Sequence, residues 1–197
     1  GVDVFFVLSG FFITGMLAGE AAETGSVNLL AFWANRSLRL LPALLVVLVL
    51  TLAAVMWLYA PIDRAEIAGN ARAVALYSGN IEFARNSADY FRSQENPLLH
   101  AWSLGVEEQF YLVWPLLVLG VAALATRKVP IEADEDTTRR ALLFFVSVAG
   151  LLSFGLSVWL TTTSQPWAFF GMPTRIWEFA AGGILALAIS RKTDFWP

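Results

Sequence analysis

The protein has 197 residues, of which 57% are hydrophobic and 15% are charged. Because soluble domains carry about 25% charged residues, this composition excludes an ordinary soluble globule and favours a multi-spanning membrane protein. The absence of cysteine excludes a disulfide framework, a thiolate metal site and a cysteine nucleophile. The net charge of −3 excludes a nucleic-acid binder built on a basic surface.

Long uncharged stretches predict an all-α, polytopic bundle with about five spanning helices. In chain order they lie at residues 4–19, 40–62, 109–126, 141–174 and 176–190; the fourth is ended by a helix stop at 161–167, and Glu178 interrupts the last. Residues 63–99 are predicted to form an extracytoplasmic loop that contains a short amphipathic helix at 63–79. Residues 127–140 are predicted to form a compact charged loop.

The distribution of basic residues predicts the orientation of these helices. With strict alternation, eight of the 13 Lys and Arg residues, including both lysines, fall on one side. That side is expected to be the cytoplasm, so Gly1 and residues 63–99 face outward. If the intact protein starts inside, an odd number of helices is expected before Gly1.

The run HAWSLGVEEQFYLVWP at 100–115 carries polar residues into a predicted span. On a helix, one face holds His100, Ser103, Glu107, Phe110 or Tyr111, and Trp114. A histidine and a carboxylate on one face can perform acid–base chemistry. The alternative is that these groups only interact with the helix dipole and cap the helix end. Glu108 is rotated by about 100° and is expected at the boundary with residues 63–99.

Arg36 and Arg39 form a second polar feature, on one face at the predicted cytoplasmic mouth of the second span. Two guanidinium groups can clamp a phosphate-bearing ligand, or they can anchor the helix to lipid head groups.

Four further polar residues lie at the ends of the predicted spans or within them. Arg175 and Glu178 are an i,i+3 pair, for which a structural salt bridge is the simplest interpretation. Asp3 is expected at the outer end of the first span, where it and Glu107 face one external pocket. Ser9 lies within that span and can bond within its own helix.

These stretches resemble the acyltransferase-3 family of bacterial membrane O-acyltransferases. The matching pieces, in the order and spacing of the family, are GVDVFFVLSGFFIT at 1–14, FWANRSLRLLPAL at 32–44, NPLLHAWSLGVEEQFYLVWPLL at 96–117 and PTRIWEFAAGGILAL at 173–187. The resemblance implies a partial catalytic domain over 1–197, whose first helix and C-terminal helices are missing. The family's expected base, a histidine on the helix before the GVD motif, would lie before Gly1.

The resemblance also implies roles for individual residues. Arg36 and Arg39 would bind the phosphates of the donor, and Glu107 would be the principal catalytic residue, supported by Asp3. His100 would position the substrate, with a role as general base the less favoured alternative. The acceptor pocket is assigned to six residues: Ser9, Trp102, Ser103, Tyr111, Arg175 and Glu178. Donors near Ser9 and Ser103 are candidates for stabilising an oxyanion.

The function implied is transfer of an acyl group, chiefly acetyl, from cytoplasmic acyl-CoA to a hydroxyl of a cell-envelope glycan such as lipopolysaccharide or peptidoglycan. The expected location is the bacterial cytoplasmic membrane. The expected partners are membrane lipid, acyl-CoA and the glycan; no nucleic acid, metal or permanently bound cofactor is expected. The alternative function is a secondary transporter with an intramembrane Glu/Arg relay.

Overall fold

The computed structural model describes residues 1–24, 27–86, 96–127 and 135–189, and every regular element in these ranges is helical. The elements in chain order are α1 (Val2–Thr24), α2 (Leu29–Leu58), α3 (Pro61–Ala75), α4 (Gly79–Asn86), the short 3₁₀ turn η2 (Leu99–Ala101), α5 (Trp102–Arg127), α6 (Glu135–Thr163), α7 (Gln165–Phe170) and α8 (Ile176–Ile189). The predicted all-α class is confirmed.

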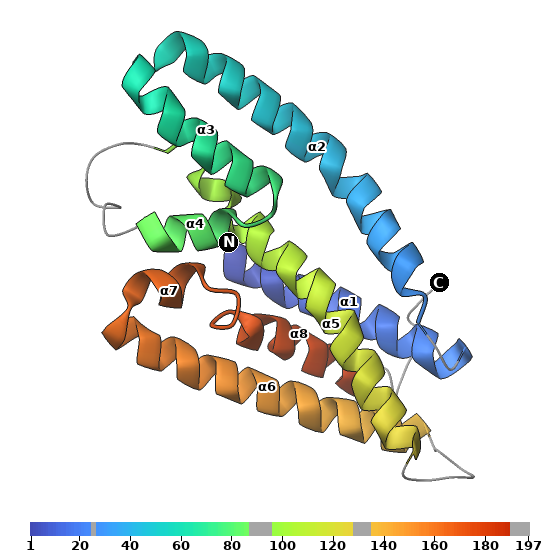
Figure 1. The fold of residues 1–197 in the computed structure, drawn as a ribbon. Helices are drawn as coiled ribbons and strands as arrows, with labels where there is room; N and C mark the ends of the chain where they lie inside the picture. Colours follow the sequence, from blue (N-terminus) through green and yellow to red (C-terminus); the bar gives the residue numbers. More distant parts are fainter. Residues whose placement is uncertain (25–26, 87–95, 128–134, 190–197) are drawn as a thin grey trace.

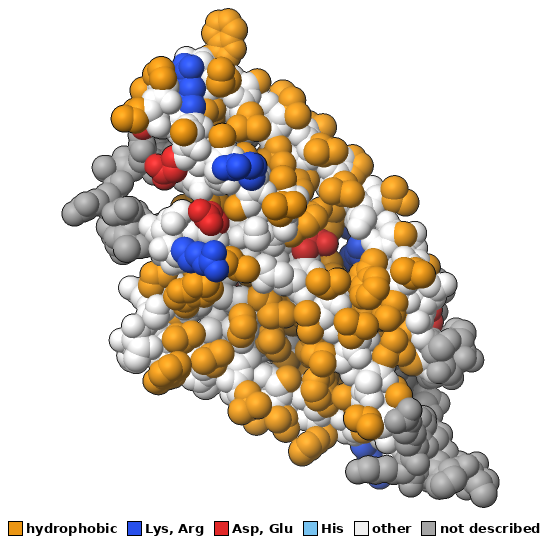
Figure 2. Space-filling model, viewed as in Figure 1, with side chains coloured by type: hydrophobic (Ala, Val, Ile, Leu, Met, Phe, Trp, Pro, Cys, Tyr) orange, Lys and Arg blue, Asp and Glu red, His pale blue; other side chains and the backbone are white. Residues whose placement is uncertain are grey.

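Within the described ranges, four helices are long and apolar enough to cross a membrane: Val2–Ala21, Leu29–Leu58, Leu99–Ala125 and Thr137–Thr163. The fifth predicted span corresponds to α8, which is apolar but has only 14 residues. Hydrophobic side chains cover much of the face shown in Figure 2, including the outside of α2. Such a surface is suited to lipid rather than to water.

Three parallel helices, α1, α5 and α8, form the centre of the bundle (Figure 1). The ring of Phe179 in α8 is stacked between Phe6 in α1 and Phe110 in α5, with centroid distances of 4.7 and 4.0 Å. All three rings are fully buried. This aromatic stack therefore sets the spacing of the three helices.

Glycines allow α1 and α8 to approach at backbone contact. A Cβ on Gly10 would collide with the backbone of Phe179, and a Cβ on Gly182 would collide with the backbone of Val7 and Phe11. Small residues serve the same purpose in other membrane helix pairs. A Cβ on Gly183 would in turn meet the side chain of Thr14, so both glycines of the Gly182-Gly183 pair face α1.

The helix α2 begins earlier than the charge pattern predicted. Asn28 caps it by accepting a 3.1 Å hydrogen bond from the backbone of Ala31, while its own backbone donates to Glu20. The helix therefore starts at Leu29 rather than near residue 40. As a correction, Arg36 and Arg39 lie inside the helix, about two and three turns after its first residue, rather than ahead of it.

The short helices α3, α4 and α7 gather at the end of the bundle where α1 and α5 begin (Figure 1). Within the predicted 63–99 loop, the chain forms the two helices α3 and α4, where a single helix was predicted. Residues 87–95 of that loop, and residues 128–134 of the charged loop predicted at 127–140, lie outside the described residues. As a correction, residues 135–140 are not loop but the first turns of α6.

Candidate active site

A carboxylate cluster, formed by Ser9, Glu107 and Tyr111, is buried between α1 and α5. The three residues are 7%, 4% and 4% exposed. The Ser9 hydroxyl donates a 2.7 Å hydrogen bond to Oε1 of Glu107, and the Tyr111 hydroxyl donates to the same oxygen. Because a buried carboxylate is costly without such donors, the cluster is a specific polar arrangement inside an apolar bundle.

The register of α1 against α5 positions this cluster. One and a half turns further along α1, Thr14 accepts a 2.9 Å hydrogen bond from the indole of Trp114. The stack of Phe110 on Phe179 holds α5 from its other side. Ser9 and Glu107 therefore meet because buried contacts on both sides of them fix the two helices.

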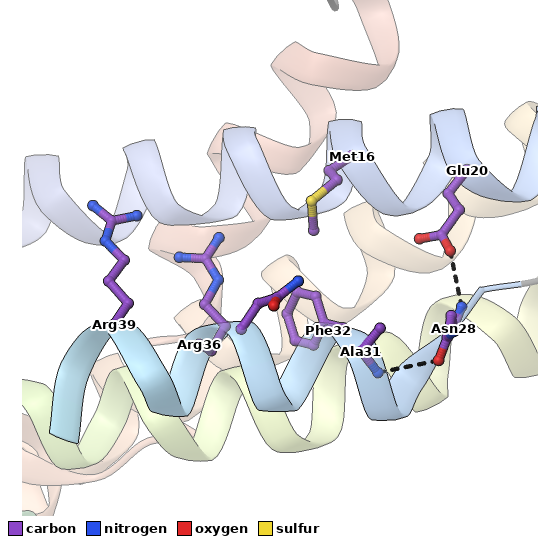
Figure 3. Close-up of a pocket in the computed structure, with 8 residues that line it drawn as sticks. Met16, Glu20, Asn28, Ala31, Phe32, Arg36 and Arg39 are labelled. Carbon is purple, nitrogen blue, oxygen red and sulfur yellow. Dashed lines mark hydrogen bonds between the residues drawn. The ribbon is translucent and has the colours of Figure 1, made fainter.

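A cavity of about 380 Å³ lies between the second half of α1 and the first half of α2 (Figure 3). Its lining residues are Met16, Glu20, Asn28, Ala31, Phe32, Asn35, Arg36 and Arg39. We call it the arginine pocket, because the side chains of Arg36 and Arg39 extend from α2 toward α1. The shared-face prediction for these two arginines is consistent with this arrangement.

Arg36 connects the arginine pocket to the carboxylate cluster. Its guanidinium lies over the ring of Tyr111, 4.8 Å from the centroid, and 5.8 Å from the centroid of Phe32. The positive charges of Arg36 and Arg39 both act on the Glu107 carboxylate. The pocket and the cluster are therefore adjacent parts of one site.

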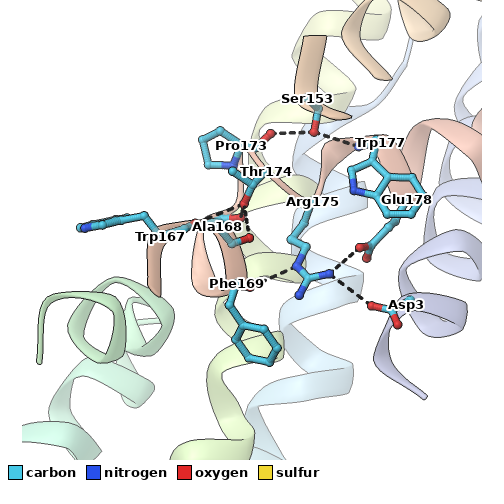
Figure 4. A network of polar contacts seen from close by, with 11 residues as sticks. Asp3, Ser153, Trp167, Ala168, Phe169, Pro173, Thr174, Arg175, Trp177 and Glu178 are labelled. Carbon is cyan, nitrogen blue, oxygen red and sulfur yellow. Dashed lines mark hydrogen bonds and ion pairs between the residues drawn. The ribbon is translucent and has the colours of Figure 1, made fainter. Parts of the chain in front are cut away.

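A second charged group, the α1–α8 ion cluster of Asp3, Arg175 and Glu178, lies where these helices begin (Figure 4). Arg175 donates to Glu178 at 2.6 Å and to Asp3 at 3.2 Å. Its Nε donates to the carbonyl of Phe169, and its guanidinium lies 5.5 Å from the ring centroid of Trp102. The structural salt bridge predicted for Arg175 and Glu178 is present.

The structure separates two acids that the sequence placed at one pocket. Asp3 and Ser9 are six residues apart on α1, or about 9 Å along the helix axis, and Asp3 pairs with Arg175 while Ser9 bonds Glu107. Asp3 is thus a member of the ion cluster rather than a neighbour of Glu107. The reason is that a helix turns Asp3 toward α8 and Ser9 toward α5.

The other predicted site residues are placed as follows. His100 is exposed on η2, where its carbonyl accepts a 3.5 Å contact from the Ser103 hydroxyl. Trp102 is 8% exposed and packs edge-on against Phe6. Ser103 and Ser9 direct their hydroxyl protons to protein acceptors, so neither is aimed at an open cavity.

An amide pair of Asn80 and Gln109, which was not among the predicted site residues, joins the short helices to α5. Asn80 at the start of α4 is 1% exposed. Its Oδ1 accepts a 2.9 Å hydrogen bond from Gln109, and its Nδ2 donates to the carbonyl of Phe170 at 3.1 Å. Gln109 also donates to the carbonyl of Tyr77 at 3.1 Å. In the sequence, Asn80 stands between Gly79 and Ile81, which marks it as a candidate buried polar residue. Its partners Gln109 and Phe170 are distant in the sequence, so the pairing could not be predicted.

Over the part of the chain that the structure describes, no group of three or more His, Asp or Glu side chains is arranged to hold a metal ion. The arrangement instead provides a cationic pocket beside a carboxylate that receives two hydroxyl donors. Such a site can bind a phosphate-bearing ligand and orient a polar reactant next to it.

Comparison with known proteins connects this site to a family. The Acyl_transf_3 family, described as an acyltransferase domain, matches residues 1–197. The chain is 33% identical over 200 residues to an O-acetyltransferase OatA of Staphylococcus aureus and 35% identical over 204 residues to the peptidoglycan O-acetyltransferase OatA of Listeria monocytogenes. All of this chain is covered in both alignments, but it spans only 30% and 29% of these relatives.

No solved structure matches the chain. The family match extends over the complete sequence, and four described helices are suited to crossing a membrane. The chain therefore belongs to the acyltransferase-3 family of multi-pass membrane proteins.

Proposed function

We propose that this chain forms part of an O-acetyltransferase that moves an acetyl group from cytoplasmic acetyl-CoA to a hydroxyl of peptidoglycan outside the cytoplasmic membrane. The single observation that carries the proposal is the contact of Arg36 with Tyr111, which joins the arginine pocket to the carboxylate cluster. The names of the Staphylococcus and Listeria relatives support acetyl transfer, and that of the Listeria relative supports peptidoglycan as acceptor.

The arginine pocket is suited to the phosphates of the donor. It lies between the end of α1 and the start of α2, which the basic residues predict to be the cytoplasmic side. Guanidinium groups bind phosphate through paired, charge-assisted hydrogen bonds. With phosphates at Arg36 and Arg39, the thioester would extend from the pocket toward the carboxylate cluster.

Glu107 is suited to orienting the reacting groups. In the proposed reaction the acceptor oxygen attacks the thioester carbon, a C–O bond forms, the C–S bond breaks, and CoA leaves as its thiol. The hydroxyl proton passes to a base, for which the family resemblance implies a histidine outside this chain. Asp3 is occupied by Arg175, so Glu107 is the acid available to hold that imidazole.

A label-transfer experiment tests this function. The full-length protein in membranes is supplied with radiolabelled acetyl-CoA on the cytoplasmic face, and label in peptidoglycan is measured. The double variant R36Q/R39Q is expected to lose most of the transfer while accumulating normally, whereas Arg72→Gln, an exposed arginine on α3, is the matched control. Uptake of label without covalent attachment to glycan would instead indicate a transporter.

A further inference from the structure

A hydrogen bond that the proposed function does not use joins α2 to α5. The indole Nε1 of Trp33 donates to the backbone carbonyl of Tyr111 at 3.0 Å. A carbonyl in the middle of an α-helix ordinarily accepts from the N–H four residues further along, so it is already satisfied within its own helix. The bond from Trp33 therefore requires an explanation.

Pro115 explains why this carbonyl is available. It lies inside α5, four residues after Tyr111, so it occupies the position whose N–H would ordinarily bond the Tyr111 carbonyl. Proline has no N–H and cannot make that bond. Because α5 is suited to crossing a membrane, water does not replace the missing donor and a neighbouring helix must supply one. Trp33 supplies it from α2.

Phe32 and Arg36, which lie close to Trp33 on α2, contact the side chain of the same tyrosine. The ring of Phe32 lies edge-on to that of Tyr111, with 6.4 Å between the centroids, and the guanidinium of Arg36 lies 4.8 Å from the Tyr111 centroid. Arg36 follows Trp33 by three positions, so it is a neighbour of Trp33 on the helix surface. Fixing the Trp33 indole on the Tyr111 backbone therefore fixes where Arg36 lies on the Tyr111 ring.

Few other contacts fix the position of this part of α2. At its start, Asn28 donates to Glu20 of α1, but the most extensive packing of α2 is with α3, and its contacts with α5 are limited. Many of its apolar side chains are exposed, including Leu45, Val46 and Leu50. Such side chains pack as well against lipid as against protein, so they do not determine the register of a helix. A directional hydrogen bond does.

We propose that Trp33 is a positioning residue for the donor: its bond to the carbonyl that Pro115 leaves free anchors α2 on α5 and thereby holds Arg36 in place beside the carboxylate cluster. This inference rests on the proposed function, because that function assigns the donor phosphates to Arg36. Trp33 is not among the residues that line the arginine pocket, so it acts through Arg36 and not by touching the donor.

Steady-state kinetics of the full-length protein test the anchor, with acetyl-CoA as donor and a soluble peptidoglycan fragment as acceptor. Trp33→Phe removes the N–H and keeps an aromatic ring. The KM for acetyl-CoA is expected to rise about tenfold, the effect of weakening one hydrogen bond to a charged group, while the KM for the acceptor stays unchanged. Trp57→Phe, the same change at an exposed position of α2, is the matched control and should alter neither KM.

Pro115→Ala separates positioning from a purely structural role. Alanine has an N–H that can satisfy the Tyr111 carbonyl within α5, so W33F/P115A should unfold at a higher temperature than W33F and should accumulate even if W33F does not. The double variant still lacks the bond between the helices, so its KM for acetyl-CoA should remain high. Pro115→Ala alone keeps the Trp33 bond, because a carbonyl oxygen can accept twice, and its donor KM should match that of the unmodified protein.

The outcomes separate this inference from the proposed function. An unchanged donor KM in W33F, or an equal rise in both KM values, would overturn the positioning role. A normal donor KM in W33F/P115A would also overturn it, because Trp33 would then only satisfy a carbonyl. A double variant that unfolds no later than W33F would show that this carbonyl is not what Trp33 stabilises. Absence of any transfer by the unmodified protein would refute the proposed function and this inference with it, but it would leave the order of the unfolding temperatures unchanged.

Discussion

The hydroxyl of Ser9 donates a 2.7 Å hydrogen bond to the carboxylate of Glu107 across 98 positions of sequence. Tyr111, one turn further along α5, donates to the same carboxylate oxygen and lies under the guanidinium of Arg36. Three helices, α1, α2 and α5, therefore converge on one acidic side chain. This convergence makes Glu107 the residue whose replacement is most informative.

Replacing Glu107 by Gln is expected to reduce acetyl transfer by about a hundredfold or more, the range for a positioned acid–base group. The amide keeps an oxygen to accept from Ser9 and Tyr111, so the protein should still accumulate in membranes. Acetylated glycan per unit of membrane protein is the measurement. Normal acetylation by Glu107→Gln or Glu107→Ala at normal protein level would remove Glu107 from the site.

Replacing Arg36 by Lys tests the planar contact with Tyr111. Lysine keeps the charge but cannot stack its head group on the ring or offer a guanidinium fork. The KM for acetyl-CoA is expected to rise about tenfold, which corresponds to roughly 1.4 kcal/mol of binding. Arg72→Lys serves as control, and equal KM values for the two variants would argue against donor binding at Arg36.

Replacing Gly182 by Ala tests the contact between α1 and α8. The new methyl group would collide with the backbone of Val7, which cannot move aside without shifting α1. A loss of about 1–3 kcal/mol of stability is expected, measured as a lower midpoint of thermal unfolding in detergent. Gly155→Ala on α6 meets no atom within 4 Å, and it should be neutral or stabilising because alanine favours the helix.

Replacing Arg175 by Met tests whether the α1–α8 ion cluster is structural. Glu178 is fully buried and would lose its cation, a change that costs about 3–5 kcal/mol for buried ion pairs. The double variant R175M/E178L removes both charges and is expected to recover most of that stability. Failure of the double variant to unfold at a higher temperature than R175M would contradict this account.

Replacing Asn80 by Ala tests the amide pair that holds the short helices. Gln109 would lose one buried partner and the carbonyl of Phe170 would lose its donor, at a cost of about 1–3 kcal/mol. Faster amide hydrogen exchange is expected in α3 and α4. Asn86→Ala, an exposed side chain that donates a hydrogen bond to Glu82 within α4, should leave exchange in α3 unchanged.

Much of the fold was predictable because a lipid bilayer restricts the secondary structures that can cross it. Uncharged runs of sufficient length become helices, since every backbone polar group must be satisfied within the segment. The predicted limits of α2 were wrong because Arg36 and Arg39 were treated as its boundary. The structure shows that charges remain inside a helix when they face a polar pocket.

For the candidate site, the sequence predicted which residues share a face of one helix, but not which residues of different helices meet. Helical periodicity placed Glu107 and Tyr111 on one face of α5, and it placed Arg36 and Arg39 on one face of α2. It could not place Ser9 against Glu107, because that contact depends on the register between α1 and α5. The same limit explains the error at Asp3, which pairs with Arg175 through the α1–α8 contact.

The membrane class, the succession of apolar helices and the faces that carry polar residues all follow from the amino-acid sequence. These properties follow from local composition and from the 3.6-residue period of the helix. Which polar faces meet depends on how the helices pack, because Gly10, Gly182 and the stack around Phe179 set the distances between helices. Packing, rather than any local pattern, brought Ser9, Glu107 and Arg36 into one site.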